Sequence, residues 1–380
     1  MAPPSAHSSR STSSRSSRSS RSSRSSRSSR RTAVRPHRQA KLAALAAALL
    51  LAVGLTAAVP PSPVAAEPAV PQPVLDPAAD PGLLQAEGRY WAYATGGLTK
   101  VASAPTPQGP WTTGPDALTR WPGWASGAGA VWAPDVLRTA DGYVLYVAAI
   151  AKGFAGQRCI GAAVSQHPGG PYEPVDRPLI CPILDGEDPV ADRPNQTSGV
   201  IDPAPFVDTD GRTYLLYKTQ KTPGTLRMVE LTADGLHVAP GAVSRELWRQ
   251  HDSIENPVMV KRGDWYVLLA SANWYDQCRY ATVWRRSKDL WSFADKPEHT
   301  LLDQANTGLC GPGGADVVIG SDEPSRIFLH GWVCPPDNGP CPYEGLVTDP
   351  NKRRVMYAAV LTWGDDDATP TVPAFLRPIT

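Results

Sequence analysis

Three acidic residues, Asp80, Asp202 and Glu255, stand at comparable places in the chain although they lie far apart in the sequence. Each belongs to a short polar segment that precedes a Tyr-rich run. Hydrolysis of a glycosidic bond needs two carboxyl groups, one to protonate the leaving oxygen and one to activate water. A third carboxylate close by keeps the acid protonated, because two negative charges at one site repel each other. If the fold brings the three together, they predict glycoside hydrolysis.

Each of these residues also has a purely structural interpretation. Asp80 and Asp202 both precede a proline, and Asp-Pro commonly opens a turn. Glu255 lies in a polar stretch that a solvated loop would also explain. Asp76 precedes a proline too and competes with Asp80. We prefer Asp80 because Pro81 keeps the repeat spacing described next.

The elements that must position these carboxylates are short strands. Runs rich in Val, Leu, Tyr and Trp alternate with clusters of Gly, Pro, Asp and Asn, without long helical periodicity. A proline precedes a tyrosine by nine residues in four units: Pro81–Tyr90, Pro134–Tyr143, Pro205–Tyr214 and Pro257–Tyr266. A fifth, weaker unit extends over 311–332. Five all-β units predict a five-bladed β-propeller, with a β-sandwich of chance spacing as the alternative.

The first strand of each propeller blade lines the central channel, so the three carboxylates would meet at one end of it. Over residues 74–365 the chain resembles glycoside hydrolase family 43, in the segments VLDPAADP, VWAPDV, IDPAPFVDTDGRTYLLY and SIENPVMVKRGDWYVLLAS. That family consists of five-bladed propellers that act on arabinose- and xylose-containing plant polysaccharides and invert the anomeric configuration. The resemblance implies Asp80 as general base, Glu255 as general acid and Asp202 as the residue that orients the acid and raises its pKa.

The fifth unit departs from the family pattern. Members commonly read Gly-Pro-Gly-His there, with the histidine near the channel axis and often near a bound ion, whereas this chain has Gly314. We expect no required cofactor, and a structural ion in the channel stays open. The resemblance implies that Trp132 lines the sugar pocket, with a core position as the alternative. We expect His330 to contact substrate as well, again with a core position as the alternative, and Asp135 to support a blade turn.

The first 66 residues have the composition of a targeting segment. Residues 8–31 are almost pure Ser and Arg and cannot form a core. The apolar run 42–59 follows basic residues and precedes small ones, which is typical of a secretory signal peptide cleaved after Ala66. An uncleaved membrane anchor is the alternative. We therefore expect residues 67–380 to form one catalytic propeller that is secreted, monomeric and without stable membrane association.

The main body is acidic and holds every cysteine. After residue 66 there are 26 basic and 36 acidic residues, which disfavours nucleic acid as a partner because phosphate binding needs clustered Lys and Arg. Six cysteines in an exported chain predict disulfides. Closeness in sequence favours Cys159–Cys181, Cys278–Cys310 and Cys334–Cys341.

The predicted function is release of arabinofuranose from arabinan or arabinoxylan of the plant cell wall by an exo-acting α-L-arabinofuranosidase. Exo action is favoured because the cysteine-bearing insertions around 159–194 and 334–341 would wall off the pocket. A β-xylosidase and an endo-α-1,5-arabinanase are alternatives, since loops at the channel mouth decide between them. A propeller that binds carbohydrate without cleaving it is a further alternative.

Overall fold

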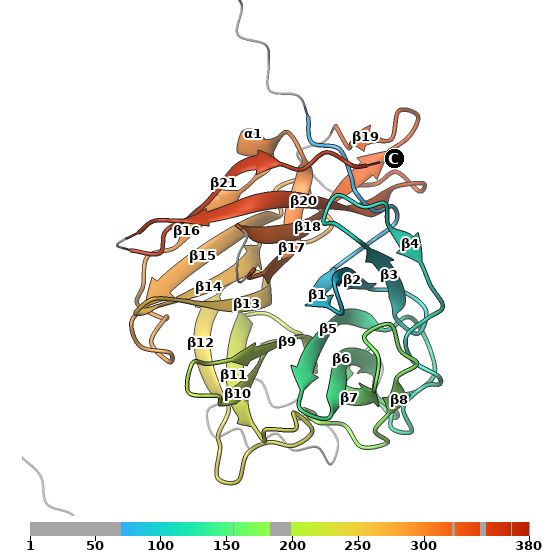
Figure 1. Ribbon diagram of the computed structural model, residues 1–380, viewed down its shortest axis with the longest axis vertical. Coiled ribbons are helices and arrows are strands. Elements are labelled where there is room, and N and C mark those ends of the chain that lie inside the picture. The colour runs from blue at the N-terminus through green and yellow to red at the C-terminus, as the bar shows by residue number, and fades with distance from the viewer. Residues whose placement is uncertain are drawn as a thin grey trace, which may run out of the picture. The chain divides into compact units, whose positions relative to one another are not determined.

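The computed structural model describes residues 70–154, 156–182, 199–320, 324–342, 347–365 and 367–379. Five antiparallel β-sheets form the blades of a propeller around a central channel (Figure 1), which confirms the predicted fold class. The predicted leader and its cleavage point lie outside the described residues. In the part of the chain that the structure describes, the one α-helix is α1 (Gln304–Thr307), and no helix is long and apolar enough to cross a membrane.

The strands of each blade follow one another in the chain. Blade 1 contains β1 (Gly82–Ala86), β2 (Arg89–Ala94), β3 (Lys100–Ala104) and β4 (Thr112–Thr113). Blade 2 contains β5 (Trp132–Thr139), β6 (Gly142–Ile150), β7 (Arg158–Ser165) and β8 (Glu173–Pro174). Blade 3 contains β9 (Val200–Val207), β10 (Thr213–Thr219), β11 (Gly224–Leu231) and β12 (Arg245–Gln250). Blade 4 contains β13 (Ile254–Arg262), β14 (Trp265–Ala272), β15 (Ala281–Ser287) and β16 (His299–Leu302). Blade 5 contains β17 (Cys310–Val318), β18 (Ser325–Cys334), β19 (Gly339–Pro340), β20 (Arg353–Trp363) and β21 (Pro370–Phe375).

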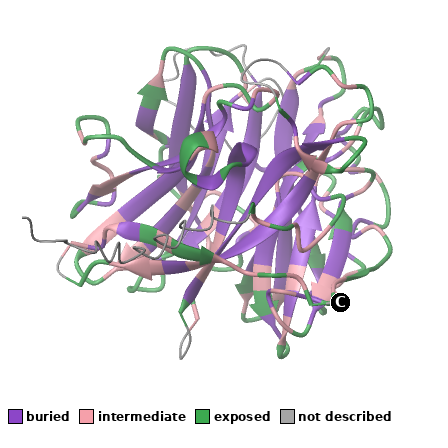
Figure 2. Ribbon diagram, turned by 90° about the horizontal axis from the view of Figure 1, so that it is seen from above, coloured by how far each residue is buried: buried purple, intermediate pink, exposed green. Residues whose placement is uncertain are grey.

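Neighbouring blades pack face to face, which explains why many strands are apolar on both sides. Every residue of β10 is buried. Successive side chains of a strand point to opposite faces, so Tyr214 and Leu216 pack toward blade 4, whereas Leu215 and Tyr217 pack toward blade 2. Five clusters of buried side chains fill the five spaces between blades. Figure 2 shows these buried strands framed by exposed loops.

The repeat spacing marks the hairpin between the first two strands of a blade. The repeated tyrosine is always the second residue of the second strand, at Tyr90, Tyr143, Tyr214 and Tyr266. In blades 1, 2 and 4 the proline nine residues earlier follows a residue with positive φ. In blade 3 the equivalent proline is Pro203, because a longer turn around Asp208 and Gly211 delays the second strand. The spacing from Pro205 is therefore a coincidence.

The ring closes between blade 1 and blade 5. β21 pairs with β20 only along 359–363, which leaves the outer edge of β20 open near its start. Residues 74–78 fill this edge: the N–H of Val74 donates to the carbonyl of Met356 (2.8 Å), and the N–H of Ala78 donates to that of Arg354 (3.0 Å). The segment before the first blade therefore completes the last one.

Three disulfides confirm the predicted pairing: Cys159–Cys181, Cys278–Cys310 and Cys334–Cys341. The second bridge joins the loop after β14 to the start of β17, and so links blades 4 and 5. Because each bridge restricts the unfolded chain, all three stabilise the fold.

Candidate active site

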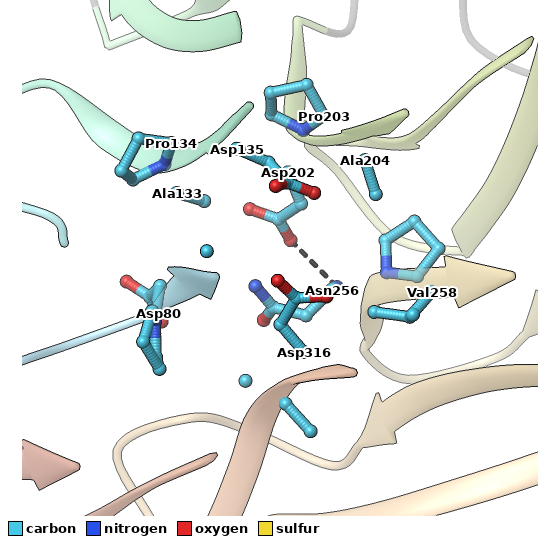
Figure 3. Close-up of a pocket in the computed structure, with 15 residues that line it drawn as sticks. Asp80, Ala133, Pro134, Asp135, Asp202, Pro203, Ala204, Asn256, Val258 and Asp316 are labelled. Carbon is cyan, nitrogen blue, oxygen red and sulfur yellow. Dashed lines mark hydrogen bonds between the residues drawn. The ribbon is translucent and has the colours of Figure 1, made fainter. Parts of the chain in front are cut away.

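The same three positions of every blade line the channel. They begin with a residue of positive φ: Asp80 (47°), Ala133 (39°), Asp202 (57°), Asn256 (47°) and Gly314 (56°). These residues and the two that follow each of them surround a small cavity of about 30 Å³ (Figure 3). A non-glycine residue at positive φ costs of order 1–3 kcal/mol and persists only where its surroundings enforce it. The fold thus imposes one backbone geometry at five places around the channel.

Asp80 supplies the carboxylate of blade 1. Its Oδ1 accepts a hydrogen bond from Arg354 Nη1 (2.5 Å), and its Oδ2 accepts one from Thr95 Oγ1 (2.7 Å). Burial raises the pKa of this carboxyl, but the charge of Arg354 and the two hydrogen bonds outweigh burial and hold the pKa below its usual value. Asp80 is therefore ionised at neutral pH, as a general base must be. The competing Asp76 instead pairs with Arg353 near the molecular surface (2.6 Å).

Blades 3 and 4 contribute Asp202 and Glu255. Asp202 accepts a hydrogen bond from the backbone N–H of Asn256 (3.0 Å), the residue after Glu255. Burial, followed by the nearby charge of Glu255, raises the pKa of Asp202 to about 7. The carboxyl of Asp202 therefore keeps its proton up to about pH 7.

Lys218 forms a buried ion pair with Glu255. Its Nζ lies 2.5 Å from Glu255 Oε2, and both side chains are buried. Its ammonium compensates the charge of Glu255, whereas Asp202 has the backbone N–H of Asn256 as its hydrogen-bond donor. The resemblance implied an ionised Asp202 that raises the pKa of Glu255. In the structure, burial and the nearby charge of Glu255 raise the pKa of Asp202 itself, whereas the charge of Lys218 lowers it.

No sequence motif surrounds Lys218 or Arg354. Lys218 interrupts the apolar run TYLLYKT in β10, where every residue is buried. A charge in such a run signals a buried partner, because an isolated buried charge is very costly. Arg354 lies on β20 of blade 5 and reaches Asp80, 274 residues earlier, across the ring closure. No local pattern reveals a contact of that kind.

Two further carboxyls, those of Asp135 and Asp316, face the same cavity (Figure 3). They occupy the third lining position of blades 2 and 5. Burial raises the pKa of both, to about 7 for Asp316, and the charge of Asp316 adds to the effect at Asp135. The expected turn support by Asp135 is incomplete: its Oδ1 accepts from the N–H of Val136 (2.7 Å), but its carboxyl lines the channel. An alignment of residues 133–135 and 314–316 with the segments that begin at Asp80 and Asp202 would have identified both carboxyls.

Trp132 and His330 occupy very different surroundings. Trp132 directly precedes Ala133, is 37% exposed, and has the guanidinium of Arg158 3.5 Å from its ring centre; its sugar contact stays a prediction. His330 has no exposed surface, and its ring stacks on Tyr280. A ring buried in this way cannot touch a sugar in the channel, so the geometry does not agree with the expected substrate contact.

The donor set does not fit a resident metal ion. Within the described residues, no three His, Cys, Asp or Glu side chains are grouped so that they could hold one. Gly314 offers no side chain where the resemblance expects a histidine. We therefore derive no step of the reaction through a metal.

The protonation states define the class of protein. An ionised Asp80 lines the same cavity as Asp202, whose carboxyl keeps its proton to about pH 7, and hydrolysis of a glycosidic bond requires one ionised and one protonated carboxyl. The chain belongs to Glycosyl hydrolases family 43, whose sequence profile matches residues 111–343. It is therefore a glycoside hydrolase, and the predicted family is confirmed.

The curated relatives described next are both named as probable arabinan endo-1,5-alpha-L-arabinosidases. The chain is 28% identical to "Probable arabinan endo-1,5-alpha-L-arabinosidase C" of Aspergillus clavatus over 298 residues, which covers 73% of this chain and 81% of the relative. It is 27% identical to "Probable arabinan endo-1,5-alpha-L-arabinosidase A" of Aspergillus oryzae over 290 residues, 73% of this chain and 80% of the relative.

Solved structures share the fold. A thermostable family-43 glycoside hydrolase superposes with a TM-score of 0.63 at 20% identity, over 82% of this chain and 98% of that one. The α-L-arabinanase of Cellvibrio cellulosa in complex with arabinohexaose superposes with a TM-score of 0.60 at 20% identity, over 78% of this chain and 96% of that one.

Proposed function

We propose that the chain is an endo-acting α-1,5-L-arabinanase that cleaves arabinan within the polysaccharide. The observation that supports hydrolysis is that Asp80 and Asp202 line one cavity from two blades, while Glu255 is buried against Lys218 directly before the lining residue Asn256. The names of the curated relatives support the linkage and the endo mode. The expected exo mode depended on insertions around 159–194 and 334–341, and residues 183–194 lie outside the described residues. Because the relatives are named as endo-acting, we prefer the endo alternative.

The proposed chemistry assigns each carboxyl one task. Asp80, kept ionised by Arg354, accepts a proton from the attacking water. Glu255, in contact with Lys218, delivers a proton to the leaving oxygen. Because water attacks directly, the anomeric configuration inverts. Asp202, which accepts a hydrogen bond from the backbone N–H after Glu255, orients the acid.

We also propose that the protein works outside the cell after cleavage behind Ala66, as a monomer on plant cell-wall arabinan. The apolar run 42–59 and the three disulfides support export. N-terminal sequencing of protein from the culture medium should begin at Glu67, and gel filtration should give one propeller per particle. Protein retained in the membrane with residues 42–59 intact would contradict the export proposal.

The test of endo action compares chain scission with release of sugar. On linear arabinan, viscosity should fall early while few reducing ends have formed, and oligosaccharides of several lengths should appear. Nitrophenyl arabinofuranoside and nitrophenyl xyloside should be poor substrates. Asp80→Asn, purified in parallel, controls for contaminating activity. Arabinose as the sole early product would restore the exo mode, and binding without any hydrolysis would favour the non-catalytic propeller.

A further inference from the structure

Gly313 and Gly314 of β17 leave a space beside the channel that two aromatic rings fill. A Cβ on Gly313 would overlap the ring of Tyr280, and a Cβ on Gly314 would overlap the ring of His330. Tyr280 and His330 are both fully buried, and they stack with ring centroids 5.7 Å apart and planes 13° apart. The glycine that departs from the family pattern is therefore sterically coupled to a histidine on the neighbouring strand β18.

His330 faces the backbone of Asp80. The N–H of Asp80 donates a hydrogen bond to His330 Nδ1 (3.1 Å), and the same Nδ1 lies 3.5 Å from Asp80 Oδ1. Burial, with the charge of Arg354, lowers the pKa of His330 to about 3. The ring is thus neutral near pH 7, and because Nδ1 accepts a hydrogen bond, its proton sits on Nε2.

The hydrogen bond from Asp80 to His330 lies at a strained backbone position, which neighbouring contacts must hold in place. Asp80 has a φ of 47°, which an L-residue other than glycine adopts uncommonly. Its side chain is held by Arg354 and Thr95, and its N–H is held by His330. The stacked pair also reaches the other side of the channel, because Tyr280 Oη donates to Asn256 Oδ1 (2.8 Å). The N–H of Asn256 in turn contacts the carboxylate of Asp202.

We propose that His330 is a positioning residue for the general base, which fixes the backbone of Asp80 so that the carboxylate faces the attacking water. His330 touches no substrate and acts only through Asp80, and the space left by Gly314 admits its ring. The inference rests on the proposed role of Asp80 as the base.

The test compares two uncharged amide variants. In His330→Asn the amide oxygen takes the place of Nδ1 and keeps the acceptor for Asp80, whereas in His330→Gln the amide lies near the place of Nε2. Displacement of a catalytic group by about 1 Å costs up to about 10²-fold. We therefore expect kcat on arabinan to fall by about 10²-fold in the Gln variant and by less than about fivefold in the Asn variant, with KM nearly unchanged in both. His299→Gln, which removes a histidine stacked on Trp284, serves as the control and should leave kcat unchanged.

A purely structural role would lower the thermal midpoint of both amide variants without separating their kcat values. Equal kcat for Asn and Gln, or a raised KM at unchanged kcat, would overturn the inference. If either variant does not fold, Gly314→Ala gives the second test: its Cβ pushes the ring away from Asp80, and an unchanged kcat in this variant would overturn the inference as well. Asp80→Asn distinguishes failure of the proposed general base from failure of the positioning role of His330. An active Asp80→Asn would refute the proposed base, whereas an inactive Asp80→Asn beside a fully active His330→Gln would refute only the positioning role.

Discussion

Replacement of Lys218 by methionine should move the basic limb of the pH–rate profile upward. Lys218 Nζ lies 2.5 Å from Glu255 Oε2, and the two side chains are only 7% and 10% exposed, so solvent screens the pair little. An opposite charge this close lowers a carboxyl pKa by about 1–3 units, or about 1.4–4 kcal/mol. The charge of Lys218 also lowers the pKa of Asp202, which is about 7 with Lys218 present.

The charge of Lys218 stabilises the ionised form of Asp202, so its removal makes loss of the Asp202 proton harder. The basic limb of kcat/KM should therefore rise by about 1–3 units in Lys218→Met. Loss of stability in this variant should be larger at pH 8 than at pH 5, because Asp202 is ionised, and gains from the charge of Lys218, only above its pKa of about 7.

The assay is kcat/KM on linear arabinan from about pH 4 to about pH 10. Lys218→Arg keeps the charge and should keep the basic limb within about one unit of the original. Lys288→Met is the matched control: Lys288 lies 3.8 Å from Asp264, and both side chains are exposed, so solvent and salt screen the lost charge. A basic limb in Lys218→Met that coincides with the unmodified enzyme, or moves downward, would refute the reasoning.

Glu255→Gln should lose much more kcat/KM on arabinan than on a dinitrophenyl glycoside of an α-1,5-arabino-oligosaccharide, whose leaving group needs little protonation, whereas Asp80→Asn should lose both activities; equal losses in Glu255→Gln would exclude it as the acid. NMR of freshly released reducing ends should show inverted configuration, since an inverting pair of carboxyls leaves about 6.5–9.5 Å for water between base and acid, and retention would contradict the assigned roles. Replacing both cysteines of Cys278–Cys310 by serine should lower the free energy of unfolding by about 4 kcal/mol, because the bridge spans 32 residues. Urea denaturation measures this loss, which should exceed the roughly 2 kcal/mol expected for Cys334–Cys341, with a separation of 7 residues.

The fold was predictable because the blades of a propeller share a sequence pattern that recurs along the chain. The tyrosine at the second position of each second strand recurs in four blades, and burial on both faces removes the polar alternation that marks a half-exposed sheet. Blade 3 shows the limit of spacing alone. Because the turn around Asp208 is longer, the structurally equivalent proline is Pro203. Pro205 lies nine residues before Tyr214 by coincidence, so the sequence spacing did not reveal the longer turn.

The site was predictable only where a motif surrounds the residue. Asp80, Asp202 and Glu255 lie in recognisable segments; Asp80 and Asp202 line the channel, and Glu255 directly precedes Asn256, which also lines it. Lys218 and Arg354 control protonation there, yet they come from the second strand of blade 3 and from β20 of blade 5. Their contacts with Glu255 and Asp80 form only when the blades assemble, so the residues next to them in the chain do not reveal these contacts.

The contact between blade 1 and blade 5 closes the propeller ring and also supports the proposed catalytic base. Residues 74–78 join β20 by a few backbone hydrogen bonds, and the partners of Asp80 from across the joint, Arg354 and His330, also belong to blade 5. Partial opening between the first and last blades therefore takes away the supports of the base while every sheet stays intact. Such local opening requires less free energy than global unfolding. On heating, the enzyme should stop working before its β-structure melts, and an oligosaccharide bound across the channel should delay that inactivation by holding the joint shut.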